Sequence, residues 1–131
     1  MMFKHNHAFS GFSVNDLDKA RAFYGDTLGM TIGEAEGQLT LEIDKGAQVF
    51  VYAKPDHVAA TYTVLNLPVD NIDEAVAGLS ARGIVFEQYD IPPYLKTDAK
   101  GIARGNGYGP DIAWFKDPAG NICSVLEQGA M

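Results

Sequence analysis

Apolar residues recur at the i, i+3, i+4 spacing of an amphipathic helix in two parts of the chain. The first set is Leu17, Ala20, Phe23, Tyr24, Thr27 and Leu28, and the second is Ile72, Ala75, Val76 and Leu79. Asp16 and Asn71 stand just before these sets and suit the N-cap position. Gly29 and Gly83 come after them, as a left-handed residue after a helix would. The pattern predicts two helices with defined starts and ends.

Strand-like runs surround both predicted helices. Residues 8–14 and 61–67 precede them and are rich in aromatic and β-branched side chains. Turn-forming residues divide the segment after each helix into three short strands. The first three are Thr31–Ala35, Gln38–Ile43 and Gln48–Ala53, and the second three are Ile84–Tyr89, Ala113–Phe115 and Ile122–Glu127. The order β-α-β-β-β therefore occurs twice.

The two helix starts are also alike in sequence. VNDLDKARA over residues 14–22 and VDNIDEAVA over residues 69–77 share Val, Asp and two Ala at matching positions. A repeat of this kind indicates two copies of one structural unit. We expect one domain over residues 1–131, with module one at about 7–54 and module two at about 60–128.

Composition limits the class of protein. The 131 residues suit one domain, and no apolar run reaches the ~20 residues of a membrane helix. Residues 1–7 carry no long apolar stretch typical of a secretory signal. The single cysteine, Cys123, excludes an internal disulfide, fits a cytoplasmic location and is expected to be buried. The net charge of −7, with no basic cluster, disfavours nucleic-acid binding.

Two stretches carry a family resemblance. Residues 12–30 contain Val, Asp-Leu, Phe-Tyr and Leu-Gly in order, and residues 113–127 contain Phe-Lys-Asp-Pro-Ala-Gly-Asn before a strand ending in Glu. Asp117 and Pro118 favour a tight turn, in which Gly120 supplies a positive φ that Asn121 also tolerates. Together the stretches resemble the glyoxalase/bleomycin-resistance/dioxygenase family, the vicinal oxygen chelate superfamily. The resemblance implies an α+β fold in which two βαβββ modules form a cup-shaped mixed sheet.

In that family the cup holds a small ligand and often a divalent metal, bound by His, Glu or Gln at four positions. These positions lie on the first and last strands of each module. By count from the helix starts, the first-strand positions hold Phe9 and Val64. The last-strand positions fall near Tyr52 or Ala53 and on Glu127. One carboxylate does not make a transition-metal site, so we expect no metal cofactor.

Three readings of Glu127 stay open. His5 and His7 alternate with Phe9, so a longer first strand would point all three to one face, and His7 with Glu127 would then hold a divalent metal. Without metal, Glu127 inside an apolar cup would act as a general base or accept a hydrogen bond from a ligand. A solvated strand end would leave it inert.

Aromatic side chains supply the other candidate site residues. The segment from Asp90 to Pro110 has no counterpart in the first half, and long irregular segments often border binding sites. Aromatic-lined clefts suit planar or cationic ligands. The expected ligand contacts are Phe9, Tyr52, Tyr94, Tyr108 and Trp114, with Arg104 for an anionic group. Each also has a plain reading as core or surface.

The sequence alone leaves three functions open. The first is a metal-free small-molecule-binding protein like the bleomycin-resistance branch. The second is a lyase, isomerase or dioxygenase of the same superfamily, acting on a small oxygenated substrate. The third is an interaction module that mainly dimerises. The resemblance implies a homodimer under all three.

Overall fold

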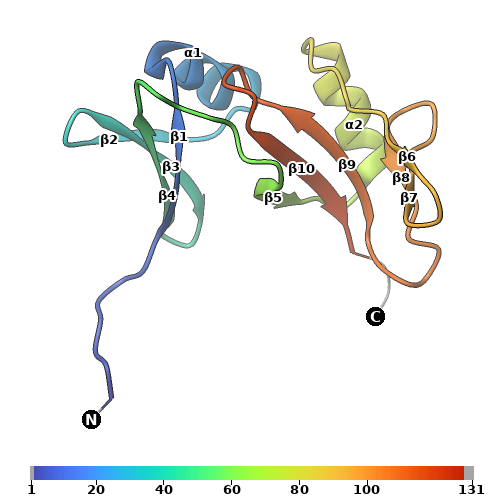
Figure 1. Ribbon diagram of the computed structural model, residues 1–131, viewed down its shortest axis with the longest axis horizontal. Coiled ribbons are helices and arrows are strands. Elements are labelled where there is room, and N and C mark those ends of the chain that lie inside the picture. Colours follow the sequence, from blue (N-terminus) through green and yellow to red (C-terminus); the bar gives the residue numbers. More distant parts are fainter. Residues whose placement is uncertain (1, 129–131) are drawn as a thin grey trace. The chain divides into compact units, whose positions relative to one another are not determined.

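The computed structural model describes residues 2–128, and the chain divides into two compact units, Met1–Val58 and Ala59–Met131. Each unit contains a four-stranded mixed sheet and a helix (Figure 1). This confirms the α+β fold class and the two-fold repeat. Among the described helices, none is long and apolar enough to cross a membrane.

Unit one has the strand order β1-β4-β3-β2. Its elements are β1 (Ser10–Val14), α1 (Leu17–Arg21), η1 (Ala22–Thr27), β2 (Ile32–Ala35), β3 (Gln38–Asp44) and β4 (Ala47–Ala53). β1 pairs with β4 in parallel, and the other pairs are antiparallel. The buried residues of these elements are Phe12, Val14, Ala20, Tyr24, Leu39, Leu41, Val49 and Val51.

The first helix starts where predicted and changes type in its second half. The side chain of Asp16 accepts a hydrogen bond from the N–H of Lys19 at 3.1 Å. After Arg21 the helix widens into a π-helix, in which the N–H of Leu28 bonds the carbonyl of Phe23. The prediction of one regular α-helix over residues 17–28 is therefore wrong. Gly25 lies close to β2 in this turn, since a Cβ there would be 3.0 Å from Ile32 Cγ1.

Unit two repeats the arrangement with the strand order β5-β10-β9-β8. Its elements are β5 (Thr63–Pro68), α2 (Ile72–Ala81), β6 (Asp90–Ile91), β7 (Leu95–Lys96), β8 (Ile102–Ala103), β9 (Asp111–Lys116) and β10 (Ile122–Glu127). β6 and β7 form a separate two-stranded hairpin. α2 packs against β9 and β10. Asn71 caps α2 as predicted, accepting the N–H of Glu74 at 2.9 Å.

The predicted strand over residues 84–89 is wrong. Residues 84–89 share the position beside β9 with β8. β8 pairs with Ala113 and Ile112 of β9. The segment itself bonds β9 through the N–H of Glu87 and the carbonyl of Trp114 at 2.8 Å. Tyr89 instead exchanges backbone and side-chain hydrogen bonds with Thr97. The segment predicted to be wholly irregular thus supplies the missing strand.

The turn between β9 and β10 is built as predicted, with one difference. Gly120 has a φ of 85°, and Asp117 Oδ1 accepts the N–H groups of Ala119 and Asn121. Asn121 is buried, and its side chain donates to Asp117 Oδ2 at 3.0 Å. Its role is this internal hydrogen bond and not a positive φ.

Candidate functional site

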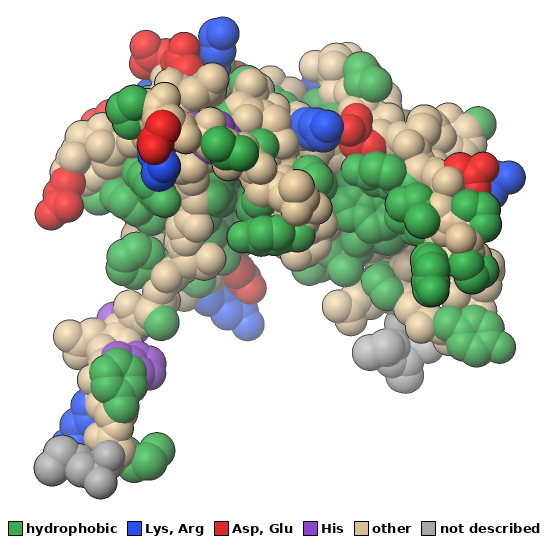
Figure 2. All heavy atoms as spheres, viewed as in Figure 1, with side chains coloured by type: hydrophobic (Ala, Val, Ile, Leu, Met, Phe, Trp, Pro, Cys, Tyr) green, Lys and Arg blue, Asp and Glu red, His purple; other side chains and the backbone are tan. Residues whose placement is uncertain are grey.

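Each sheet has one face toward its core and one face opposite. In unit two the side chains of Ala113, Phe115, Cys123 and Val125 are buried on the side of α2. Because strand side chains alternate, Trp114 and Ser124 point to the opposite, helix-free face. Cys123 is free and buried, as predicted. Hydrophobic side chains gather over the region of β9 and β10 in Figure 2.

Trp114 lies on the helix-free face of unit two and contacts two other side chains there. Its indole N–H donates to Thr63 Oγ1 at 3.2 Å. The ring of Tyr89 meets the indole edge to face, with centroids 5.5 Å apart. Burial raises the pKa of Tyr89; the Glu87 carboxylate adds to this shift and Lys116 opposes it. Trp114 is half-buried, so part of its surface can still contact a ligand.

The helix-free face of unit one carries three aromatic side chains in a row. Val49 and Val51 are buried, so Phe50 and Tyr52 between and beyond them point to the other face. The rings of Phe50 and Tyr52 are stacked at 5.9 Å, and Phe9 meets Phe50 edge to face at 6.2 Å. We call Phe9, Phe50 and Tyr52 the aromatic row. The sequence predicted two of its members.

A polar pair adjoins this row. Ser13 is the register partner of Tyr52 across β1 and β4. Its Oγ shares a hydrogen bond with Nδ1 of His57 at 2.6 Å, and both side chains are half-buried. The partners are 44 positions apart in the sequence, which explains why no local pattern revealed the pair.

Glu127 lies on the opposite side from Trp114. It shares strand parity with Cys123 and Val125, which face α2. Its Oε1 accepts the N–H of Ile72, the first residue of α2, at 2.8 Å. The carboxylate of Glu127 therefore lies at the start of α2, on the other side of the sheet from Trp114. The role of Glu127 as a base or metal ligand stays a prediction. Its hydrogen bond with α2 does not support that role.

Arg104 is held by carboxylates. Its guanidinium bonds both oxygens of Asp73, at 2.9 and 3.2 Å, and lies 3.5 Å from Asp98 and 3.6 Å from Asp111. The hydrogen bond to Asp73 is the largest cause that raises the pKa of Arg104. The same bond lowers the pKa of Asp73. This arrangement favours the surface reading of Arg104 over contact with an anionic ligand.

The two loop tyrosines project from unit two. Tyr94 comes after β6 and is 86% exposed, and Tyr108 is 98% exposed. Phe9, just before β1, is also 70% exposed despite its contact with Phe50. No finding tests whether these residues touch a ligand, and their role stays a prediction.

The expected metal positions do not supply a donor set. The side chains of Phe9 and Val64 carry no ligating atom, the third position falls at Tyr52 or Ala53, and Glu127 accepts a hydrogen bond at the start of α2. β1 begins at Ser10, so the strand does not extend back to His7, which lies in an exposed segment leading away from the sheet (Figure 1). Within residues 2–128, no group of three or more His, Cys, Asp or Glu side chains is placed to hold a metal ion. The residues present do not fit a transition-metal site.

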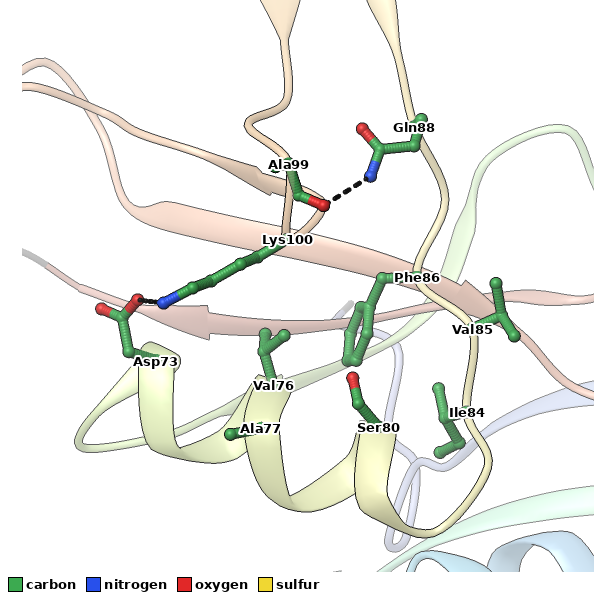
Figure 3. A pocket seen from close by; sticks show the side chains of 10 residues that line it. All are labelled: Asp73, Val76, Ala77, Ser80, Ile84, Val85, Phe86, Gln88, Ala99 and Lys100. Carbon is green, nitrogen blue, oxygen red and sulfur yellow. Dashed lines mark hydrogen bonds and ion pairs between the residues drawn. The ribbon is translucent and has the colours of Figure 1, made fainter.

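A groove of about 460 Å³ lies elsewhere in unit two, between α2 and residues 84–88. Figure 3 shows Val76 and Phe86 in its middle and Lys100 reaching toward Asp73 at one end. Gln88 closes the other part of the rim by donating to the carbonyl of Ala99 at 3.2 Å. None of the residues predicted to contact a ligand lines this groove.

Comparison with solved structures shows the same fold in several bacterial proteins. TnmS3, an antibiotic binding protein from Streptomyces sp. CB03234, is 19% identical with a TM-score of 0.66, over 98% of this chain and 100% of that one. A superfamily member from Sphaerobacter thermophilus DSM 20745 is 24% identical with a TM-score of 0.66, over 97% and 99%. A glyoxalase/bleomycin resistance protein from Catenulispora acidiphila DSM 44928 is 24% identical with a TM-score of 0.60, over 92% and 96%.

No curated protein sequence is similar enough to this chain to be matched. The family model for the Glyoxalase/Bleomycin resistance protein/Dioxygenase superfamily matches residues 4–125. This match covers both sheets and both helices as the structure describes them, apart from the last two residues of β10. The chain belongs to the Glyoxalase/Bleomycin resistance protein/Dioxygenase superfamily.

Proposed function

We propose that this protein binds a planar aromatic small molecule without metal and without converting it. The observation that carries the proposal is the aromatic character of the helix-free sheet faces. Trp114 and Tyr89 meet on one such face, and the aromatic row occupies the other. Aromatic side chains bind planar molecules by offset stacking and edge-to-face contact.

The aromatic rings are held in place before any ligand arrives. The bond from Trp114 to Thr63 fixes the indole, and Tyr89 packs against it. Phe50 and Tyr52 lie on a central stretch of β4, paired on both sides by β1 and β3. Side chains ordered in advance lose less conformational entropy on binding, which raises affinity.

The net charge of −7 adds a preference among planar ligands. An acidic protein attracts cations over a distance of about a Debye length, and cations also bind the faces of aromatic rings. We therefore expect a cationic dye to bind more tightly than an anionic dye of similar area. The name of TnmS3, an antibiotic binding protein, supports a small-molecule ligand within this fold, and it does so only by analogy.

The alternative, an enzyme of the same superfamily, finds less support. Its expected base, Glu127, is engaged by the backbone of α2. The side chains of Phe9 and Val64, at two of the other expected metal positions, lack donor atoms. The phenol of Tyr89 meets Trp114, and its raised pKa keeps it protonated near neutral pH, where it is not available as a base. Assembly as a homodimer stays a prediction.

Fluorescence tests the binding proposal, because Trp114 is the single tryptophan. Titration with acridine orange, a planar cation, should quench its emission in a saturable way. Anthraquinone-2-sulfonate, a planar anion, should bind more weakly. Equilibrium dialysis on Trp114→Phe should show a loss of affinity for acridine orange of about ten-fold.

Phe3→Ala is the matched control, since that ring is 85% exposed and is not among the expected ligand contacts. It should bind acridine orange as the parent protein does. Absence of saturable binding by both dyes would overturn the proposal. Elemental mass spectrometry of untagged protein tests the metal-free part: near-stoichiometric iron, zinc, manganese or nickel, lost in Glu127→Ala, would overturn that part.

A further inference from the structure

The indole of Trp114 crosses the middle of the sheet in unit two. Trp114 is on β9, and its ring N–H donates to Thr63 on β5 at 3.2 Å. β10 lies between these two strands, so the indole spans β10 to reach its acceptor. Ser124, the register partner of Trp114 on β10, is fully buried, as expected for a residue that the indole crosses. The half-buried ring therefore lies along the sheet and keeps part of its surface exposed on the helix-free face.

Asn66 lies on β5, beside the acceptor end of this indole. It is the register partner of Ser124, and its Oδ1 accepts a hydrogen bond from the Ser124 hydroxyl at 2.7 Å. Both side chains therefore point to the helix-free face, as Trp114 does. Thr63 and Asn66 pair with β10 residues two positions apart, a separation of about 7 Å along the strand. A planar molecule that stacks on the Thr63 end of the indole thus has its rim beside Asn66.

The amide nitrogen of Asn66 is a hydrogen-bond donor that the protein leaves unused. An asparagine amide has one acceptor oxygen and two N–H donors. Ser124 uses the oxygen, and within residues 2–128 no group accepts a hydrogen bond from the nitrogen. Asn66 is exposed, so a ligand can reach these donors. Ser124 is buried, so its hydroxyl holds the amide in place without itself meeting the ligand.

We infer that Asn66 selects planar aromatic ligands that carry a hydrogen-bond acceptor, such as a ring nitrogen or a carbonyl oxygen, on the edge nearest β5. The inference rests on the proposed function and narrows its class of ligand. The indole of Trp114 supplies stacking, which any planar ring can use. An apolar edge would cover the N–H groups of Asn66 without bonding them, which costs free energy, whereas an acceptor restores a hydrogen bond to them.

Quinoline and naphthalene test the inference, because they have the same shape and differ in one ring nitrogen. In mildly alkaline buffer that nitrogen is unprotonated and acts as an acceptor. Equilibrium dialysis measures the affinity of each probe. Asn66→Asp removes both N–H donors and keeps an acceptor oxygen for Ser124. This variant should bind quinoline about five-fold more weakly, the effect of one hydrogen bond, and naphthalene within about two-fold of the parent protein.

Asn15→Asp is the matched control, since it makes the same change of charge at an exposed position of unit one. It should bind both probes as the parent protein does. Nuclear magnetic resonance of the nitrogen-labelled parent protein gives a second readout. Quinoline should shift the side-chain amide signals of Asn66, which are identified by their loss in Asn66→Asp, more than naphthalene does.

Unchanged binding of quinoline by Asn66→Asp, or an equal loss for the two probes, would overturn the inference. Absence of binding by both probes to the parent protein would also overturn it. The proposed function is decided separately, by the binding of acridine orange and its loss in Trp114→Phe. Circular dichroism of each variant checks that it is folded.

Discussion

The carboxylate of Glu127, the last residue of β10, accepts the backbone N–H of Ile72, the first residue of α2, at 2.8 Å. The first N–H groups of a helix have no partner within the helix. Asn71 satisfies the N–H of Glu74 locally, and Glu127 satisfies that of Ile72 from 55 residues away. A negative charge at this end also interacts favourably with the helix dipole. Glu127 therefore ties the sheet to the helix that covers it.

We predict that Glu127→Ala lowers the free energy of unfolding by about 1 kcal/mol, the usual effect of losing a helix-capping side chain. Glu127→Gln keeps an acceptor oxygen and loses the charge, so it should cost about half as much. Urea denaturation measures both. Affinity for acridine orange should not change in either variant, and a ten-fold loss in Glu127→Gln would instead place the carboxylate in the ligand site.

Local patterns in the sequence predicted local structure well. Asp16 and Asn71 cap their helices, and Gly29 takes a φ of 74° after the first one. The Asp117–Asn121 turn forms as expected. Each of these depends on residues within four positions of one another, where side-chain type and spacing determine which hydrogen bonds can form.

Features that depend on distant contacts were missed. Glu127 was assigned from its place at a strand end, while its face is set by its parity with Cys123 and Val125. The segment 84–89 has strand-like residues, but Thr97 and β8 compete for its partners. The Ser13–His57 pair joins residues far apart in the chain. For these features the sequence offered one usable signal. The alternation of apolar residues in the last strand indicates which face Glu127 shares with Cys123 and Val125.

The loop before β9 depends on one glycine. A Cβ on Gly105 would lie 1.9 Å from the carbonyl oxygen of Gly109, an impossible contact with backbone. The loop is closed there by bonds from Gly105 N–H to Asp111 and from Tyr108 N–H to Gly105. We predict that Gly105→Ala opens the loop and lowers the melting temperature by several degrees, equivalent to about 1–3 kcal/mol.

Gly109→Ala is the matched control for that prediction. A Cβ on Gly109 meets nothing within 4 Å, and its backbone does not require a positive φ. Differential scanning calorimetry should show a small change or none. Equal losses in the two variants would mean that flexibility, and not the close approach at Gly105, decides the stability of the loop.

The ion pairs between Arg104 and its carboxylate partners predict that the stability of the protein depends on pH in the acid range. The hydrogen bond from Arg104, with its charge, holds the pKa of Asp73 below the ordinary value, and the slight burial of Asp73 opposes this. A lowered pKa in the folded state contributes stability that is present above the unfolded value of about 3.9 and is lost as pH falls below it. We predict that Arg104→Gln is less stable than the parent protein at pH 7 and that the difference shrinks below about pH 4.

Thermal melts from pH 7 to pH 2 measure this difference. Arg82→Gln, at the C-terminal end of α2 and so at the opposite end from Asp73, is the control for removal of one positive charge. A difference between parent protein and Arg104→Gln that stays constant down to pH 2 would show that packing of the arginine stem, and not its carboxylate partners, carries the effect.

The raised pKa of Tyr89 predicts a change in its titration at alkaline pH. Burial against Trp114 raises the pKa of its phenol. The absorbance change at 295 nm that is lost in Tyr89→Phe should therefore have its midpoint above about pH 10. Because the unfolded chain releases this proton first, the stability contributed by Tyr89 is present below pH ~10 and falls as pH rises beyond it.

The neighbours of Tyr89 separate burial from charge as the cause. The Glu87 carboxylate raises its pKa and Lys116 lowers it, and the two form an ion pair at 3.3 Å. Glu87→Gln should therefore move the midpoint down and Lys116→Gln should move it up. Since burial is the largest cause, the midpoint should stay above about pH 10 in both variants. A midpoint at the ordinary value in Glu87→Gln would make charge the main cause and would mean that water reaches the phenol beside Trp114, leaving that face less apolar than a planar ligand requires.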